Sequence, residues 1–104
     1  MSYLLLIEVL DQLGIPVAYN HFNEPTSLPF ITVTETEPDY IFADDINFYE
    51  KEFYEVEYYF RYKDPEKEKE IEQLFKDNHI IYVNYGDIWI SDERIYQKIY
   101  EVTI

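Results

Sequence analysis

The side chains that could do chemistry in this chain are mainly carboxylates, and three of them gather in one segment. Asp39, Asp44 and Asp45 lie within residues 36–50, TEPDYIFADDINFYE. Clustered carboxylates attract hard cations such as Ca²⁺ and Mg²⁺. A calcium-binding loop, however, places carboxylates at alternate positions around a central glycine, and that pattern is missing here. The sequence therefore does not favour a metal site.

The two histidines, His21 and His79, belong to no spacing that a metal site or a general base requires. His21 and Glu24 would share one face of a helix, but Pro25 follows at once and makes this segment a loop. His79 directly follows a predicted helix, where a partial positive charge suits the C-terminal end of the helix dipole. We expect a structural role for both.

Nucleophiles and phosphate-binding loops are equally scarce. Ser2, Ser27 and Ser91 lie in no nucleophile-elbow motif. Gly14 and Gly86 are the only glycines, whereas a phosphate-cradling loop needs several. Because no set of nucleophile, base and metal ligands is visible, we expect no catalytic residue, no cofactor and no enzyme activity.

The charge is the most informative property of the composition. The chain has 22 acidic and 8 basic residues, a net charge of −14 over 104 residues, and 19% of its residues are aromatic. A protein of this sign repels nucleic acid and anionic lipid. Aromatic side chains, in contrast, are enriched where proteins meet. We therefore expect a soluble protein that contacts other proteins and binds no specific nucleic acid sequence.

Compartment signals are few. The absence of cysteine removes disulfides and thiol chemistry and is compatible with a reducing cytoplasm. The apolar run at residues 4–7 has no Lys or Arg before it and Glu8 directly after it, unlike a signal peptide. It is also far shorter than the ~20 apolar residues that cross a bilayer. We expect neither secretion nor membrane insertion.

Two amphipathic helices are predicted. Residues 2–13 place apolar side chains at i, i+3, i+4 and i+7, and Gly14 can take the left-handed position that ends a helix. The second helix begins after Asp64, the expected N-cap, with Pro65 at its first position. Asn78 is the expected C-cap. Both helices have one apolar face and should therefore pack against a sheet.

Five strands are predicted, at residues 30–35, 52–62, 80–84, 87–91 and 94–104, and the two short ones flank a turn at Tyr85, Gly86 and Asp87. Residues 52–62 alternate most clearly, so one face of this strand should be buried. That face consists of Tyr54, Val56, Tyr58, Phe60 and Tyr62.

The order of the predicted elements is helix, strand, long loop, strand, helix and three further strands. The later strands are joined by hairpins rather than by helical crossovers, which predicts an α+β fold with a mainly antiparallel sheet and two helices packed on it. Residues 1–104 fit one domain. Residues 16–29 are predicted to be a loop, and residues 36–50 form the long loop between the first two strands, unless 46–50 extend the following strand.

A set of exposed side chains is predicted to meet another subunit. Phe53 and Tyr59 interrupt the charged face of the long strand, either as ordinary cross-strand partners or as intersubunit contacts. Trp89 is read as core or hairpin packing rather than as an exposed anchor. Residues 37–48 mix aromatic and acidic side chains. The predicted interface comprises Tyr40, Ile41, Phe42, Asp44, Asp45, Phe53 and Tyr59.

Four stretches carry a resemblance that runs from Ile15 to Ile104: IPVAYNHFNEPTSLPFITV, FADDINFYEKEFYEVEYYF, DPEKEKEIEQLF and WISDERIYQKIYEVTI. Together they resemble small neck or tail-completion proteins of tailed phages and prophages of Gram-positive bacteria, of the tail-terminator and head-tail joining class. The positions that carry the resemblance are Pro16, Tyr19, Phe22, Pro25, Pro29, Phe30, Ala43, Asp44, residues 93–96, Tyr100 and Glu101.

The resemblance implies an α+β virion protein that forms a homo-oligomeric ring, usually of six copies, at the head-proximal end of the tail tube. Such a ring stops tube growth and joins the tail to the head. In such proteins the loop between the first two strands is a candidate for ordering on assembly, and the mixture of aromatic and acidic side chains at residues 37–48 suits that role. The implied partners are the tail-tube protein and head-completion or neck proteins. The implied location is the bacterial host cytoplasm during assembly and the virion afterwards. No catalysis is implied.

A different class of function also fits the charge. A small acidic protein can mimic DNA and inhibit a basic nucleic-acid-binding protein by occupying its groove. Such a mimic should bind tightly and lose affinity steeply as salt rises, because its contacts are ionic. A neck protein should instead bind its partners through apolar contacts. The type of partner and the effect of salt distinguish the two alternatives.

Overall fold

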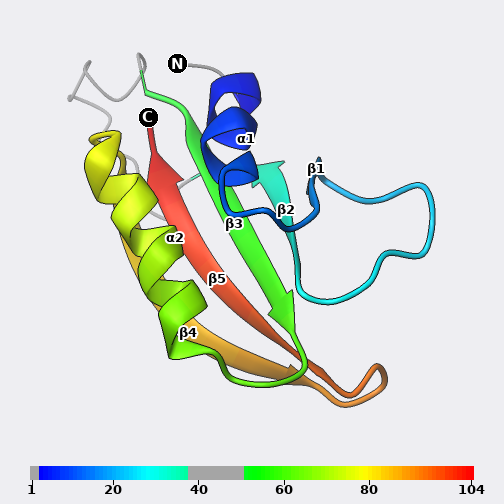
Figure 1. Ribbon diagram of the computed structural model, residues 1–104. Helices are drawn as coiled ribbons and strands as arrows, with labels where there is room; N and C mark the ends of the chain where they lie inside the picture. Colours follow the sequence, from blue (N-terminus) through cyan, green and yellow to red (C-terminus); the bar gives the residue numbers. More distant parts are fainter. Residues whose placement is uncertain (1–2, 38–50) are drawn as a thin grey trace.

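The computed structural model describes residues 3–37 and 51–104. In this part of the chain two helices lie on one side of a single twisted sheet (Figure 1). The elements in chain order are α1 (Tyr3–Asp11), β1 (Val17–Tyr19), β2 (Phe30–Glu35), β3 (Phe53–Phe60), α2 (Pro65–Asp77), β4 (Ile81–Ile90) and β5 (Ile95–Thr103).

The five strands lie in the order β1-β2-β3-β5-β4. Within the described part of the chain, only β1 and β2 run parallel, while the other neighbours are antiparallel. The predicted α+β fold with a mainly antiparallel sheet and two helices is therefore confirmed. The chain also places β1 and β4 at the two edges of the sheet, which the order of elements along the sequence does not reveal.

Helix α1 has the predicted apolar face. Leu6, Val9 and Leu10 are buried against the sheet, in keeping with their helical spacing. After the helix, Gly14 has φ +77°, the left-handed conformation that a residue without Cβ adopts readily. Ile15 then packs against the core. The predicted left-handed conformation of Gly14 is thus confirmed. The helix itself ends at Asp11, two residues before the predicted end at residue 13, and residues 12 and 13 form a turn.

The prediction of a loop throughout residues 16–29 is wrong at one place, because Val17–Tyr19 forms β1. This strand pairs in parallel with residues 31–33 of β2. The N–H of Ile31 donates to the carbonyl of Pro16 at 2.9 Å. Prolines and turn residues around these three positions indicate a loop, but pairing with a distant strand decides their conformation.

Strand β3 forms the centre of the sheet and has the predicted alternation. Tyr54, Val56, Tyr58 and Phe60 are all buried under the helices. The strand ends at Phe60, however, and the Tyr62 side chain is 81% exposed. The prediction that Tyr62 belongs to the buried face is wrong because the chain turns toward α2 after Phe60.

Helix α2 begins and ends where local sequence signals place it. The Asp64 carboxylate accepts a hydrogen bond from the N–H of Lys67 at 3.2 Å, and Pro65 is the first helical residue. At the other end the Asn78 side chain donates to the carbonyl of Leu74 at 2.8 Å. Ile71 and Phe75 are completely buried. Both predicted caps are confirmed.

The predicted turn at residues 85–87 is wrong, because Ile81–Ile90 is one continuous strand, β4, with an irregularity between Asn84 and Asp87. The Gly86 N–H donates to the Asn84 side chain at 2.8 Å, and Gly86 has φ +86°. These features make a β-bulge, which uses the same residue types as a hairpin turn. The actual turn joins β4 to β5 at residues 91–94.

The opposite side of the sheet, which we call the open face, carries the other half of each strand's side chains. At its centre it is polar, with Glu57 and Gln97 on neighbouring strands β3 and β5. Over β2 it is partly covered by the β1–β2 loop, whose Phe22 ring packs edge-on against Phe30 at 5.1 Å between centroids. Of the predicted long loop, only residues 36 and 37 lie within the described part of the chain.

Candidate protein-docking surface

Among the described residues, strand β4 lies at the edge of the sheet and pairs with β5 alone. It is ten residues long and carries a single charged side chain, Asp87. An edge strand of this length leaves alternate backbone N–H and C=O groups open to another chain. Its backbone therefore offers a template for contact with a further polypeptide.

The side chains of β4 are as unusual as its position. Five large apolar side chains of this strand are about half exposed or more, and we call them the β4 edge: Ile81 (66%), Val83 (47%), Tyr85 (58%), Ile88 (47%) and Trp89 (51%). Contiguous exposed apolar side chains mark interaction surfaces in soluble proteins. Natural edge strands usually carry charges or prolines that prevent pairing, and here the bulge at Gly86 is the protective feature.

Trp89 shows how the β4 edge is anchored in the subunit. One side of its ring packs against Tyr96 of β5, with centroids 4.8 Å apart. The Tyr96 ring in turn stacks on Phe60 of β3 at 5.4 Å. The predicted packing role of Trp89 holds for this contact, but half of the side chain stays open. A large aromatic side chain held in one orientation and half exposed is suited to bind a partner.

The only charge on β4 is neutralised within the subunit. The Asp87 carboxylate lies 2.9 Å from Lys63 Nζ and 3.1 Å from Lys98 Nζ. Burial alone would raise the pKa of Asp87, but hydrogen bonds from Lys63 and Lys98 outweigh it and hold the pKa below its usual value. The strand therefore presents no uncompensated charge to a neighbour.

Asp87 belongs to a cluster of four charged side chains, completed by Lys63, Lys98 and Glu68 of α2. Lys98 Nζ lies 3.4 Å from Glu68, and Lys63 Nζ lies 2.8 Å from the same carboxylate. Lys98 and Glu68 are both buried. Because the cluster joins α2, β4, β5 and the loop after β3, it fixes the bulged part of the edge strand to the rest of the domain.

A second polar contact holds the other half of β4. The hydroxyls of Tyr82 on β4 and Tyr100 on β5 both donate to Glu72 of α2, at 3.3 and 3.0 Å. The Tyr82 ring also packs on Phe75 at 5.2 Å between centroids. The helix-facing side of β4 is thus tied down at both ends, which leaves the outer side in a defined conformation.

Tyr59, one of the predicted interface residues, lies in a cross-strand network on the open face. Its hydroxyl donates to Glu57 at 2.8 Å. The Gln97 amide donates to the Glu57 carboxylate at 2.7 Å and to the Tyr59 hydroxyl oxygen at 3.0 Å. Burial, aided by Glu57, raises the pKa of Tyr59 to about 12. The cross-strand role is therefore present, and a contact with another subunit stays a prediction.

The other predicted interface residues are distributed differently. Phe53 is half-buried at the start of β3, opposite Thr103 of β5. The remaining five, Tyr40, Ile41, Phe42, Asp44 and Asp45, lie outside the described residues. Analysis of the sequence missed the β4 edge, although the segment IYVNYGDIWI carries a signal for it: ten residues with one charge and apolar side chains on both faces.

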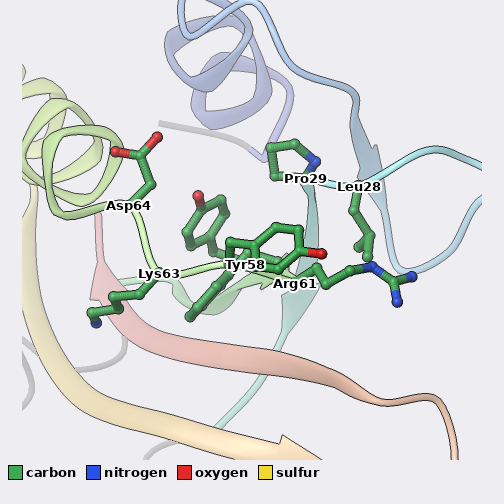
Figure 2. A pocket seen from close by; sticks show the side chains of 8 residues that line it. Leu28, Pro29, Tyr58, Arg61, Lys63 and Asp64 are labelled. Carbon is green, nitrogen blue, oxygen red and sulfur yellow. The ribbon is translucent and has the colours of Figure 1, made fainter.

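A pocket of about 420 Å³ opens beside the end of β3 (Figure 2). Its polar side chains include Arg61, Lys63 and Asp64. Arg61 and Lys63 extend in opposite directions, as Figure 2 shows, so the two cations do not converge on one ligand. Lys63 is already engaged by Glu68 and Asp87. We assign no catalytic or binding role to this pocket.

The two histidines take no part in a metal cluster of the described chain. His21 lines an open groove of about 320 Å³ together with Glu24, Tyr59 and Glu93. His79 follows α2 with φ +57°. Within residues 3–37 and 51–104, no group of three or more His, Cys, Asp or Glu side chains is arranged to hold a metal ion. Helices long and apolar enough to cross a membrane are likewise absent from these residues.

Comparison with protein-family models and with curated protein sequences finds no match for this chain. The assignment of a function therefore depends on the residues themselves. Of the surfaces described above, the β4 edge combines open backbone groups, exposed apolar side chains and a single charge of its own that is paired within the subunit. It is the strongest candidate for a functional surface in the described part of the protein.

Proposed function

We propose that the protein is a structural virion subunit of a tailed phage or prophage. It forms a ring at the head-proximal end of the tail, terminates the tail tube and joins the tube to the head. The observation that carries the proposal is the β4 edge: a ten-residue apolar strand that, among the described residues, pairs with no strand but β5, in a protein of net charge −14. Such a strand is suited to permanent contact with other protein chains.

The acidic charge supports a role in which DNA passes without binding. A wall of the same sign as DNA releases no counterions and so offers the genome no favourable contact. On the described surface, Glu66 and Glu70 of α2 carry part of this charge, with side chains 82% and 56% exposed. Asp44 and Asp45 are further candidates for the channel wall. Replacing both by Lys should slow genome ejection, and unchanged ejection would argue against their position in the channel.

The proposal is tested by mixing the purified protein with tail-tube protein and measuring mass by light scattering, with negative-stain images of any large species. We expect a ring that caps tubes and stops their growth. The variant Val83→Asp places a charge in the β4 edge and should prevent capping. Tyr62→Asp is the matched control, because Tyr62 is exposed but lies outside the β4 edge.

The same experiment distinguishes the proposed structural role from that of a DNA mimic. A mimic would remain unassembled, leave tail tubes uncapped and bind a basic DNA-binding protein with an affinity that falls steeply with salt. A neck protein binds its partners through apolar side chains, so its binding should persist in high salt. Uncapped tubes together with salt-sensitive binding to a basic protein would overturn the structural role.

A further inference from the structure

We propose that copies of this chain associate head to tail, with the β4 edge of one copy seated on a second apolar surface at the opposite edge of the next copy's sheet. This second surface, which we call the α1–β1 surface, is formed by Tyr3, Leu4 and Tyr19. The inference rests on the proposed function, since it specifies how subunits of the same ring meet.

The α1–β1 surface is apolar and built from two elements. Leu4 is 60% exposed, while Tyr3 and Tyr19 are each 38% exposed. The rings of Tyr3 and Tyr19 pack against each other, with centroids 4.7 Å apart, so α1 and β1 present one joint surface. Leu6 and Leu10 point into the core and hold the helix in place.

The two apolar surfaces lie at opposite edges of the sheet, because β1 and β4 are its first and last strands (Figure 1). Among the described residues, the exposed large apolar side chains other than Leu5 and Tyr62 belong to one surface or the other. Two different surfaces at opposite edges cannot cover each other within one copy. Contact between the β4 edge of one copy and the α1–β1 surface of the next covers both. Repetition of this heterologous contact generates a ring when the rotation between neighbours closes, as the proposed function requires.

Contact between two β4 edges is the main alternative, and it explains less. Pairing of identical surfaces is isologous and stops at two copies. It would also leave the α1–β1 surface exposed in the product. The head-to-tail arrangement accounts for both apolar surfaces with one interface.

The charge distribution favours the same pair of surfaces. Each copy adds −14, so association through most of the surface brings like charges together. The single charge of β4 is neutralised by Lys63 and Lys98. The first turn of α1 contains no acidic residue, and the first charge along the helix is Glu8. The residues that form the two apolar surfaces therefore add no unpaired charge to the contact.

The test uses two variants of the whole chain, each with one surface blocked. In the edge variant, Ile81→Asp and Ile88→Asp charge the β4 edge at positions opposite the uncharged Thr103 and Gln97. In the helix variant, Leu4→Asp charges the α1–β1 surface in the first turn of a helix, where an acidic side chain is tolerated well. Circular dichroism checks that both variants fold, and Ile81→Thr with Ile88→Thr replaces the edge variant if it does not.

Head-to-tail contact predicts that each variant alone is a monomer and that an equimolar mixture forms a heterodimer. The mixture contains one intact β4 edge and one intact α1–β1 surface, so assembly stops at two copies. Wild-type protein and the control variant Tyr62→Asp should both form rings, which are larger than the heterodimer. The mass measured by light scattering distinguishes the monomer, the heterodimer and the ring.

Three results would overturn the inference: association of the helix variant alone, association of the edge variant alone, or a mixture that stays monomeric. A wild-type protein that is monomeric at all concentrations and salt conditions would overturn it as well. Failure of the proposed function is seen separately, as wild-type protein that forms rings through these surfaces but does not cap tail tubes.

Discussion

Lys98 and Asp87 face each other across β5 and β4, with Lys98 Nζ 3.1 Å from the Asp87 carboxylate. The Lys98 side chain is only 5% exposed, and it also lies 3.4 Å from Glu68 of α2. This relationship connects the bulge of the exposed edge strand to a helix on the buried side of the sheet. The shape of the proposed docking surface therefore depends on charges that lie beneath it.

Replacing Lys98 by Met should lower the free energy of unfolding by about 3 kcal/mol, because Lys63 alone then faces the carboxylates of Glu68 and Asp87 and one negative charge of the cluster is left uncompensated. Denaturant titration measures the change. Lys69→Met is the matched control: Lys69 Nζ lies 3.8 Å from Glu66, and both side chains are more than three-quarters exposed. That substitution should cost less than about 1 kcal/mol. Equal effects of the two would show that the four-charge cluster adds no stability.

The pH dependence of stability should change when Asp87 is replaced by Asn. Hydrogen bonds from Lys63 and Lys98 hold the pKa of Asp87 below its ordinary value of 3.8, despite burial, which acts in the opposite direction. A carboxyl whose pKa is lowered on folding contributes stability above its unfolded pKa and loses it as the pH falls through the folded pKa.

Wild-type protein should therefore exceed Asp87→Asn in stability at neutral pH, and the difference should shrink once the pH falls below about 4. Thermal unfolding of both proteins over this range is the measurement. The carboxylates that do not contact Lys63 or Lys98 are common to both proteins, so their titration cancels in the comparison. A difference that stays constant down to the lowest pH would contradict the proposed ion pairs.

Tyr59 should make a stability contribution that is lost in alkali. Burial and the neighbouring Glu57 carboxylate raise the pKa of Tyr59 to about 12 from its ordinary value of 10.0. A group whose pKa is raised on folding contributes stability below its unfolded pKa and loses it as the pH rises through the folded pKa. The difference between wild-type protein and Tyr59→Phe should therefore diminish between pH 10 and about pH 12, as followed by unfolding in denaturant.

Tyr58 provides the internal comparison for that experiment. Burial raises the pKa of Tyr58 to about 12 as well, but its ring lies under the helices and stacks on Phe60, with centroids 5.0 Å apart. Wild-type protein and Tyr59→Phe share this tyrosine, so its titration does not affect the difference. If the two proteins lose stability in parallel above pH 10, the Tyr59 network does not exist in solution.

The parts of the fold that were predicted correctly are those that neighbouring residues determine. The ends of α2 follow from Asp64, Pro65 and Asn78, which act within one helical turn. Strand β1 was missed because its pairing with β2 is a tertiary contact across a loop. The turn was misplaced because Asn84 and Gly86 suit both a hairpin and a bulge, and only the register with β5 distinguishes the two.

The candidate docking surface was missed for a related reason. Alternation in a sequence shows which side chains share a face, but the exposure of β4 depends on its position at the edge of the sheet. The edge position follows from the strand order, and the strand order depends on pairing between segments that are distant in the sequence. The charge of −14 was visible from composition, whereas the neutralisation of Asp87 by Lys63 and Lys98 required three segments to meet.

Gly86 offers a test of whether the bulge shapes the β4 edge. A Cβ added at this position meets nothing within 4 Å, so steric overlap is not the obstacle. The obstacle is φ +86°, which side chains of L-residues rarely adopt. Gly86→Ala should therefore lower the free energy of unfolding by about 1 kcal/mol, and Gly86→Asn should cost less, because Asn tolerates the left-handed region.

The two variants should also differ in self-association, measured by light scattering at equal protein concentration. Gly86→Asn retains the bulge and should assemble like wild-type protein. Gly86→Ala strains the bulge, and because Asn84, Asp87 and their partners on β5 surround it, displacement there would shift Tyr85 and Ile88 of the β4 edge. Assembly should then weaken more than the loss of stability explains. Unchanged assembly of Gly86→Ala would mean that the bulge does not shape the surface on which association depends.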